Sequence, residues 1–221
     1  MLNTGIDYIT RLKFSFMKKL YFFLILLTLS TLSFAQIINY GIKAGLNLST
    51  IYFNNSNTAG NYKYLSGFNA GGIVNIEFSN FTIQPGLFYS TKGDKVPVVL
   101  VTQNQIASVT TGTNRLNYLE LPVNILYNFL NIPQGNLHLG GGPYLGYGVS
   151  EKGSVNGKSI SGPFTEFARN SDYGLNFIVG ARFMNKFLAD ASYGLGLANS
   201  GGNGSTLQNR VISFSVGYLF R

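Results

Sequence analysis

Along almost the whole chain after residue 36, apolar residues alternate with small or polar ones, and this period of two limits the possible folds more than any other feature. Alternation at this period puts successive side chains on opposite faces of a β-strand. In residues 37–50, one face carries Ile38, Tyr40, Ile42, Ala44, Leu46 and Leu48, and the other carries Asn39, Gly41, Lys43, Gly45, Asn47 and Ser49. No stretch shows convincing helical periodicity. The sequence therefore predicts an all-β fold whose strands have two chemically different faces.

The alternating segments predict eight strands, and each is long enough to cross a bilayer at a tilt, which takes about 9–11 residues. The predicted strands are 37–50, 67–78, 81–92, 117–129, 136–149, 172–183, 186–197 and 210–220. Long polar connections alternate with short turns; the long ones are 51–66, 93–116, 150–171 and 198–209, and the short ones are 79–80, 131–135 and 184–185. This alternation is typical of outer-membrane barrels. We therefore expect an eight-stranded antiparallel up-and-down transmembrane β-barrel with both chain ends on the periplasmic side.

Charge is segregated between the two faces of the predicted strands. Six charged residues and the single histidine fall, by strand parity, on the face opposite the apolar one: Lys43, Glu77, Lys92, Glu120, His138, Arg182 and Asp190. A charge that faces lipid at mid-depth costs about 2–4 kcal/mol, so a lipid-facing surface requires this segregation. Aromatic residues on the apolar face gather near both strand ends, as in the interfacial girdles of membrane proteins. We interpret the apolar face as the lipid-facing one.

A soluble barrel with its apolar face turned inward, as in a lipocalin-type binding protein, is the main alternative. The interior of an eight-stranded barrel is only just wide enough for side chains. It could not hold five or six large apolar residues from every strand, whereas the face rich in glycine and serine fits a narrow lumen. The membrane barrel is therefore favoured.

Three prolines fall inside the predicted strands: Pro85, Pro122 and Pro143. Proline has no N–H to donate to a neighbouring strand and is normally confined to edges or bulges. Because a closed barrel has no free edge, we expect local bulges or strand ends at these positions.

The N-terminal segment has the order of a secretory signal peptide. Lys18 and Lys19 form a positive region, residues 20–32 form an apolar run, and small residues lead up to Ala35. The run is shorter than the roughly 20 residues that a membrane-spanning helix needs. We expect a signal peptide at residues 17–35, cleavage between Ala35 and Gln36, and one barrel domain at residues 36–221. Residues 1–16 precede a normal start and are interpreted as an upstream start artefact.

Composition excludes several classes of site. The chain has no cysteine, so it can form no disulfide, thiolate zinc site or cysteine nucleophile. The net charge is +8, but after residue 35 lysine and arginine are scattered singly without a run, so we expect no nucleic-acid binding. The glycine-rich segments 140–142 and 201–204 open no helix and precede no Lys-Ser/Thr, so they are not phosphate cradles. We expect no cofactor and no metal site.

Five charged residues are predicted to share the narrow lumen: Lys43, Glu77, Glu120, Arg182 and Asp190. A buried charge must be paired or hydrogen-bonded. We therefore expect a structural polar network that plugs the lumen and makes the barrel closed. His138 lies near the periplasmic start of its strand, away from the outer rim, so we interpret it as a buried structural histidine and expect no enzymatic activity.

Several motifs, in order along the chain, resemble the PorT-like outer-membrane β-barrel family of Bacteroidota. The resemblance rests on Gly41–Ser49, Ile83–Gly93, Tyr118–Pro122, Gly142–Gly146 and Asn209–Phe220, and it covers essentially residues 36–221. It implies an outer-membrane location, contact with outer-membrane lipid and insertion by the barrel assembly machinery. The family's namesake branch is tied to secretion across the outer membrane.

The sequence supports three hypotheses of function. The first is a structural or interaction protein that presents polar extracellular loops on a closed barrel, because exposed loops on a rigid scaffold usually carry recognition. Its partner would be an unknown extracellular or periplasmic protein, and a link to secretion or envelope integrity would fit. The second is a narrow pore for small solutes, and the third is a lipid-modifying barrel enzyme.

Overall fold

The computed structural model describes residues 37–54, 63–102, 105–155, 158–162, 171–198 and 206–220. The predicted signal peptide, its cleavage site and the proposed start artefact lie outside these residues and stay predictions. Within the described ranges, no helix is long and apolar enough to cross a membrane.

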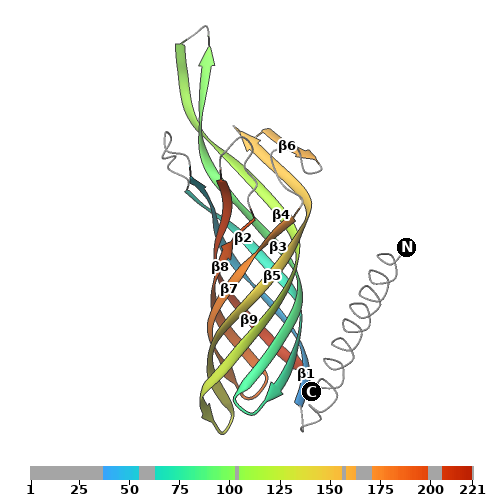
Figure 1. Ribbon diagram of the computed structural model, residues 1–221. Coiled ribbons are helices and arrows are strands. Elements are labelled where there is room, and N and C mark those ends of the chain that lie inside the picture. The colour runs from blue at the N-terminus through green and yellow to red at the C-terminus, as the bar shows by residue number, and fades with distance from the viewer. Residues whose placement is uncertain are drawn as a thin grey trace, which may run out of the picture. The chain divides into compact units, whose positions relative to one another are not determined.

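The described residues form one antiparallel sheet that closes on itself (Figure 1). Its strands are β1 (Ile37–Asn54), β2 (Lys63–Phe78), β3 (Phe81–Thr102), β4 (Gln105–Ile132), β5 (Gly135–Val155), β6 (Lys158–Gly162), β7 (Ser171–Phe183), β8 (Phe187–Gly196) and β9 (Thr206–Phe220). Strand β1 pairs with β9, and β4 pairs with β5, so eight strands complete a ring. The ninth, β6, pairs with β5 alone. The prediction of an eight-stranded antiparallel barrel is confirmed.

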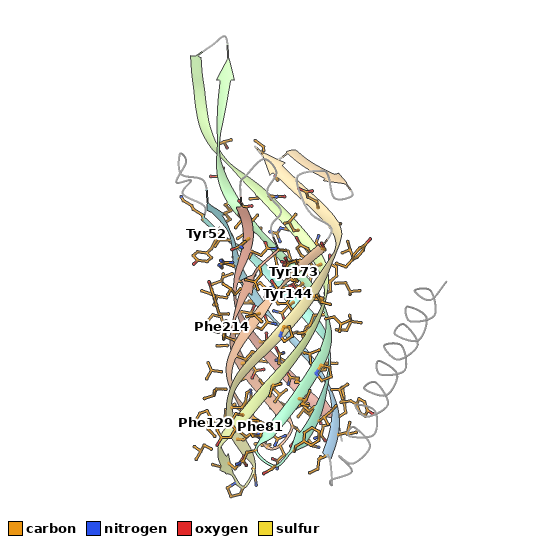
Figure 2. The ribbon with its side chains drawn as sticks, in the orientation of Figure 1. Tyr52, Phe81, Phe129, Tyr144, Tyr173 and Phe214 are labelled. Carbon is orange, nitrogen blue, oxygen red and sulfur yellow. The ribbon has the colours of Figure 1, made fainter. Side chains whose placement is uncertain are left out.

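Side chains alternate across the barrel wall as the sequence pattern predicts. Leu46, Leu145 and Val216 face outward and are 68%, 67% and 67% exposed. Figure 2 shows Phe81 and Phe129 near the end that carries the short turns, and Tyr52 and Tyr173 near the other end. Large apolar residues exposed over the whole outer wall are unfavourable in water but suit a hydrocarbon environment. The outward face is therefore the lipid-facing one.

The short turns are tight because their residues accept unusual backbone angles. Met184 and Asn185 have φ values of 50° and 55°. Positive φ at both central residues is what a two-residue hairpin needs to match the twist of its strands. The turn also joins its neighbours, because the Asn185 N–H donates to the Gln134 carbonyl at 2.9 Å. The predicted turn at 184–185 is therefore confirmed.

The long connections contain more strand than the sequence pattern indicated. The prediction of a loop over 93–116 is wrong, because β3 and β4 continue as a paired hairpin as far as Thr102 and Gln105. Valine and other β-branched residues are frequent in this segment, and they favour extended structure even outside the membrane. Figure 1 shows this hairpin rising well beyond the other strands, at the end opposite the short turns. Strands β5 and β6 extend the wall in a similar way over part of the predicted loop 150–171.

The expected bulges or strand ends at Pro85, Pro122 and Pro143 are absent from the described strands, so that prediction is wrong. Each proline lies inside a strand, and the β3–β4, β4–β5 and β5–β7 registers are the same on both sides of it. A strand residue directs its N–H toward only one of its two neighbours, so proline removes one hydrogen bond and leaves the other seam intact. Register shifts occur elsewhere, two of them near the extracellular ends of β2 and β5.

Candidate functional site

A buried ion pair and a histidine connect three strands across the lower lumen. Lys43 Nζ of β1 lies 2.5 Å from Asp190 Oδ2 of β8, and the other oxygen of Asp190 lies 2.9 Å from His138 Nε2 of β5. The three side chains are 8%, 3% and 2% exposed. Gly180 leaves room for this contact, because a Cβ there would come within 2.8 Å of His138 Nε2. The carboxylate thus has a partner on each oxygen, as a buried charge requires.

A second ion pair crosses the barrel near its periplasmic end. Arg182 Nη1 of β7 lies 2.5 Å from Glu77 Oε1 of β2, and the Asn39 amide donates to the same oxygen at 3.0 Å. Strands β2 and β7 are four strands apart in the ring of eight, so this pair spans the lumen at its widest. The Asn136 side chain, with its oxygen toward Arg182, accepts from Nε at 3.2 Å and Nη2 at 2.9 Å.

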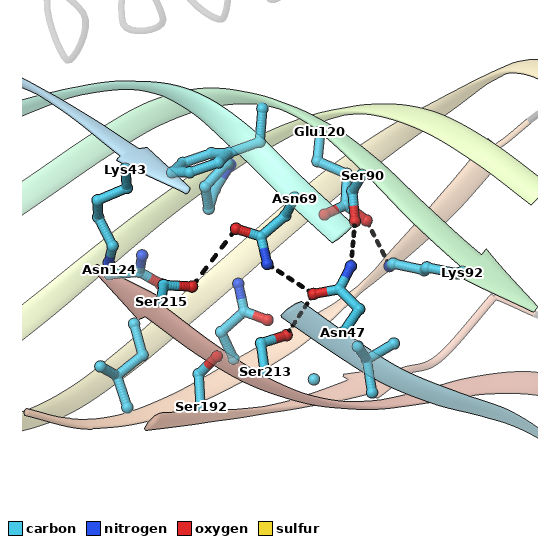
Figure 3. Close-up of a pocket in the computed structure, with 16 residues that line it drawn as sticks. Lys43, Asn47, Asn69, Ser90, Lys92, Glu120, Asn124, Ser192, Ser213 and Ser215 are labelled. Atoms are coloured by element: carbon cyan, nitrogen blue, oxygen red, sulfur yellow. Dashed lines mark hydrogen bonds and ion pairs between the residues drawn. The ribbon is translucent and has the colours of Figure 1, made fainter. Parts of the chain in front are cut away.

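An apolar layer lies on the periplasmic side of the Lys43–Asp190 pair, because Ile73 and Leu219 both pair with Gly41, two residues before Lys43. On the extracellular side of this pair the lumen opens into a small cavity. Ile73, Leu188 and Leu219 are buried against one another, with Phe88 packed beside them. The cavity measures about 90 Å³, and its lining reaches from Lys43 to Lys92 (Figure 3).

Asparagine and serine side chains from different strands meet in this cavity. Asn47 accepts from the Asn69 amide at 2.6 Å and from the Ser213 hydroxyl at 2.8 Å, and it donates to Ser90 Oγ at 3.1 Å (Figure 3). Asn124 is buried, and its side-chain oxygen has no hydrogen-bond partner among the described residues. The cavity has room for a few water molecules, since one water needs roughly 10–15 Å³.

A third charged cluster lies on the extracellular side of the cavity. Lys92 of β3 pairs with Glu120 of β4 and with Asp172 of β7, the latter at 2.9 Å. The Lys92 ammonium also lies 4.3 Å from the centre of the Tyr144 ring. Asp172 Oδ2 accepts from the Tyr144 hydroxyl at 3.2 Å and from the Asn209 amide at 3.0 Å. Five strands therefore meet at this one cluster.

The structure brings together four of the five residues of the predicted lumenal network as two pairs, Lys43–Asp190 and Glu77–Arg182. The fifth, Glu120, lies in the separate upper cluster. Strand parity predicts Lys92 on the lumenal face, but the predicted network contains neither Lys92 nor Asp172. Asp172 has the lumenal parity of its strand, so parity alone could have found it. The buried aromatic rings were not expected, because the lumenal face was judged from its many glycines and serines.

Asp94 of β3 is a buried carboxylate near the extracellular end, with 3% of its surface exposed. No hydrogen bond or ion pair from another described residue reaches its side chain. It lies five residues beyond Tyr89, an aromatic residue of the outer girdle, and so outside the membrane-spanning part of β3. Burial raises the pKa of Asp94 to about 6.

Among the described residues, no group of three or more histidine, aspartate or glutamate side chains could hold a metal ion. His138 is 2% exposed and lies against Asp190 and Asn136.

A closed ring of strands with a lipid-facing outer wall and charged, buried residues inside defines a small transmembrane β-barrel of the outer-membrane type. The comparison with protein families agrees: the chain belongs to the family described as "Outer membrane protein beta-barrel domain", whose model matches residues 34–201. The protein is therefore a small outer-membrane β-barrel protein.

Several solved outer-membrane barrels are similar to the described fold. They include the attachment invasion locus protein Ail of Yersinia pestis, in complex with the heparin analogue sucrose octasulfate (18% identity, 83% of this chain and 99% of that chain, TM-score 0.41). Neisserial surface protein A is 12% identical over 82% of this chain and 97% of that chain, with a TM-score of 0.46. OprG of Pseudomonas aeruginosa is 13% identical over 84% of this chain and 95% of that chain, with a TM-score of 0.43. No curated protein sequence matches the chain.

Proposed function

We propose that this protein is a closed barrel that presents extracellular segments for an interaction. The observation that carries the proposal is the pair Glu77–Arg182, which spans the lumen between opposite strands with both side chains about 15% exposed or less. The apolar layer of Ile73, Leu188 and Leu219 and the upper cluster around Lys92 add two further obstructions. An ion that crossed the lumen would have to break buried pairs, which is costly.

Electrical conductance tests the closed lumen. The barrel reconstituted in a planar bilayer is expected to show no steady ohmic current. Replacement of both Glu77 and Arg182 by alanine is a matched variant that removes one of the three obstructions; because the apolar layer and the cluster around Lys92 remain, it should also show no steady current. A steady current of nanosiemens size from the unmodified protein would refute the closed barrel and favour the alternative, a narrow pore for small solutes.

The interaction role rests on the hairpin of β3 and β4. Its backbone pairing continues from Val96↔Gly112 to Thr102↔Gln105, above the last β2–β3 pair at Lys63↔Lys95. A stiff extension on a rigid barrel is a suitable site for recognition. A variant in which residues 96–112 are replaced by a short turn should insert into the membrane normally. It should lose any cellular phenotype that depends on binding a partner at this hairpin. If shortening this hairpin and trimming the remaining extracellular segments leave every cellular phenotype unchanged, the interaction role is refuted.

We also place the chain in the PorT-like branch of outer-membrane barrels, with a role in secretion or envelope integrity and an unidentified extracellular or periplasmic partner. The ordered motifs from Gly41–Ser49 to Asn209–Phe220 support this placement. Insertion would depend on the barrel assembly machinery. Deletion of the gene, followed by a screen of secreted proteins and of sensitivity to envelope stress, tests the role. Normal secretion and an intact envelope would argue against it.

A non-enzymatic role is part of the same proposal. His138 is buried among structural partners, away from the extracellular rim where a lipid substrate would lie. His138→Ala should leave the lipid composition of the outer membrane unchanged. An altered lipid profile in a variant that still folds would favour the lipid-modifying enzyme.

A further inference from the structure

Four basic residues that are scattered in the sequence come together at the extracellular ends of β2, β3, β4 and β5. They form what we call the rim cluster: Lys63, Lys95, Arg115 and Lys152. Lys63 is the direct cross-strand partner of Lys95, and Arg115 is that of Lys152. Like charges directly opposite each other on antiparallel strands destabilise a sheet. Two such pairs on adjoining strands are unfavourable unless an anion lies close to them.

The register places the rim cluster on the outward face. The β3–β4 pairing has one constant register from Phe88↔Glu120 to Leu100↔Ser108. By strand parity, Lys95 and Arg115 share the face of Tyr89 and Leu119, both of which are exposed on the lipid-facing wall. Between them on this face, Thr91 and Asn117 are buried and hydrogen-bonded to each other, so the cluster lies above a covered polar pair. Arg115 lies opposite Gly93, two residues from Lys95, so the two cations are diagonal neighbours, at roughly 7–8 Å. The two repulsive pairs thus form one continuous patch.

Two β-bulges bring the outer members of the cluster to this face. Strand β2 has one more residue than β3 between the pairs Tyr64↔Asp94 and Asn69↔Ser90. Strand β5 gains one residue in the same way, because consecutive residues of β4 pair with Gly148 and then Ser150. A slip of one residue moves side chains to the opposite face of a sheet. Without these bulges, strand parity would direct Lys63 and Lys152 toward the lumen.

Among the side chains that the structure describes, none neutralises these four cations. No hydrogen bond, ion pair or ring contact within the described ranges holds any of them. In contrast, the other cations of the barrel wall that lie near the lumen or the upper girdle have partners: Lys43, Lys92, Arg182 and Arg210. The neighbouring acids, Asp94 and Glu151, lie opposite Asn114 and Leu116 on the other face. At the height of the rim cluster, the basic side chains therefore point outward and the carboxylates point inward.

The height of the rim cluster above the aromatic girdle indicates which part of the membrane its side chains contact. Arg115 is four residues beyond Leu119, and Lys95 is six residues beyond Tyr89. At about 3.3 Å per residue and a tilt near 40°, these positions lie roughly 10–15 Å above the girdle, where long side chains reach the head-group layer. Arginine and lysine are the side chains best suited to phosphate oxygens. We propose that the rim cluster binds the phosphate groups of anionic lipids in the outer leaflet.

Binding of a phosphorylated lipid to the whole protein tests the proposal. Protein purified from outer membranes would be placed in zwitterionic nanodiscs, and the affinity for added diphosphoryl lipid A would be measured by native mass spectrometry. The test variant carries Lys63→Gln, Lys95→Gln, Arg115→Gln and Lys152→Gln. Lys186→Gln is the control, because Lys186 lies in the turn between β7 and β8 at the opposite membrane surface. We expect the fourfold variant to bind at least tenfold more weakly and the control to stay within twofold.

Stability gives a second readout that a failure to fold cannot mimic. In zwitterionic nanodiscs, the fourfold variant should unfold at a higher temperature than the unmodified protein, because like-charge repulsion is relieved. In nanodiscs with lipid A the order should reverse. Single variants Lys95→Gln and Arg115→Gln should show the same reversal on a smaller scale.

Equal lipid A affinities for the fourfold variant and the unmodified protein would overturn the proposal, as would the same order of stability in both lipids. A soluble sulfated oligosaccharide is the competing ligand. If it binds the unmodified protein in zwitterionic nanodiscs as tightly as lipid A does, the assignment to a lipid is overturned.

Discussion

Breaking the buried pair Lys43–Asp190 should destabilise the barrel far more than removing both of its charges. The two side chains are 8% and 3% exposed and 2.5 Å apart, so neither remaining partner could regain contact with bulk water. Removal of one partner of a buried pair typically costs about 3–5 kcal/mol, whereas replacement of both is often close to neutral. Lys43→Met leaves Asp190 with His138 as a hydrogen-bond partner at 2.9 Å, so its cost should be near the lower limit. Asp190→Asn leaves the ammonium without any counter-charge and should cost more.

The double variant Lys43→Met/Asp190→Asn should recover most of this loss and stay within about 2 kcal/mol of the unmodified protein. The assay is guanidinium-induced unfolding of the barrel in lipid vesicles, followed by tyrosine fluorescence. Ser192→Ala is a suitable control, because Ser192 also lines the lumen and has no side-chain hydrogen bond to any other described residue. Additive costs in the double variant would show that the two charges are not coupled in the lumen, and the reasoning would fail.

Three further predictions concern the wall, the mouth and the packing of the lumen. Val216→Lys places a charge on a position that is 67% exposed on the lipid-facing wall, and it should lower the free energy of unfolding by about 2–4 kcal/mol in the same assay. An unchanged free energy of unfolding would show that Val216 does not face lipid. Gly180→Ala should destabilise the barrel by more than 1 kcal/mol, because a Cβ would come within 2.7 Å of the Ala189 carbonyl oxygen; a neutral effect would contradict the close packing. Burial raises the pKa of Asp94 from 3.8 to about 6, so the folded protein holds a proton that the unfolded chain loses, and stability should fall as pH rises between these values. Asp94→Asn should therefore stabilise the barrel by about 1–2 kcal/mol at pH 7 and by almost nothing at pH 4; a stability profile with the opposite slope would refute the assignment.

The period-two pattern was sufficient to predict the fold because each strand must present one face to lipid. Residues such as Leu46 and Val216 have no alternative environment, so their parity determines which way the whole strand faces. Pairing inside the lumen was only partly predictable. Parity places Glu77 and Arg182 inside, but only the ring order shows that they face each other across it.

The extracellular end was less predictable, for a physical reason. Beyond the membrane no lipid enforces alternation, so the hairpin of β3 and β4 carries a different pattern and was interpreted as a loop. The bulges in β2 and β5 reverse the local parity, and no single-sequence pattern signals an extra residue in one strand. For this reason Lys63 and Lys152 looked like isolated charges, although the register places them beside Lys95 and Arg115.

In the barrel, one face of each strand meets lipid while the other encloses a closed lumen, and single-cysteine scanning of β9 can detect both environments. The chain has no cysteine of its own, so each introduced thiol reports on one position only. A fluorophore attached at position 212, 214, 216 or 218 should be quenched strongly by brominated lipids. Thiols at 213 and 215 should escape lipid quenching and also react slowly with a water-soluble reagent. Equal quenching along the strand, or fast aqueous labelling at 213 and 215, would contradict this arrangement.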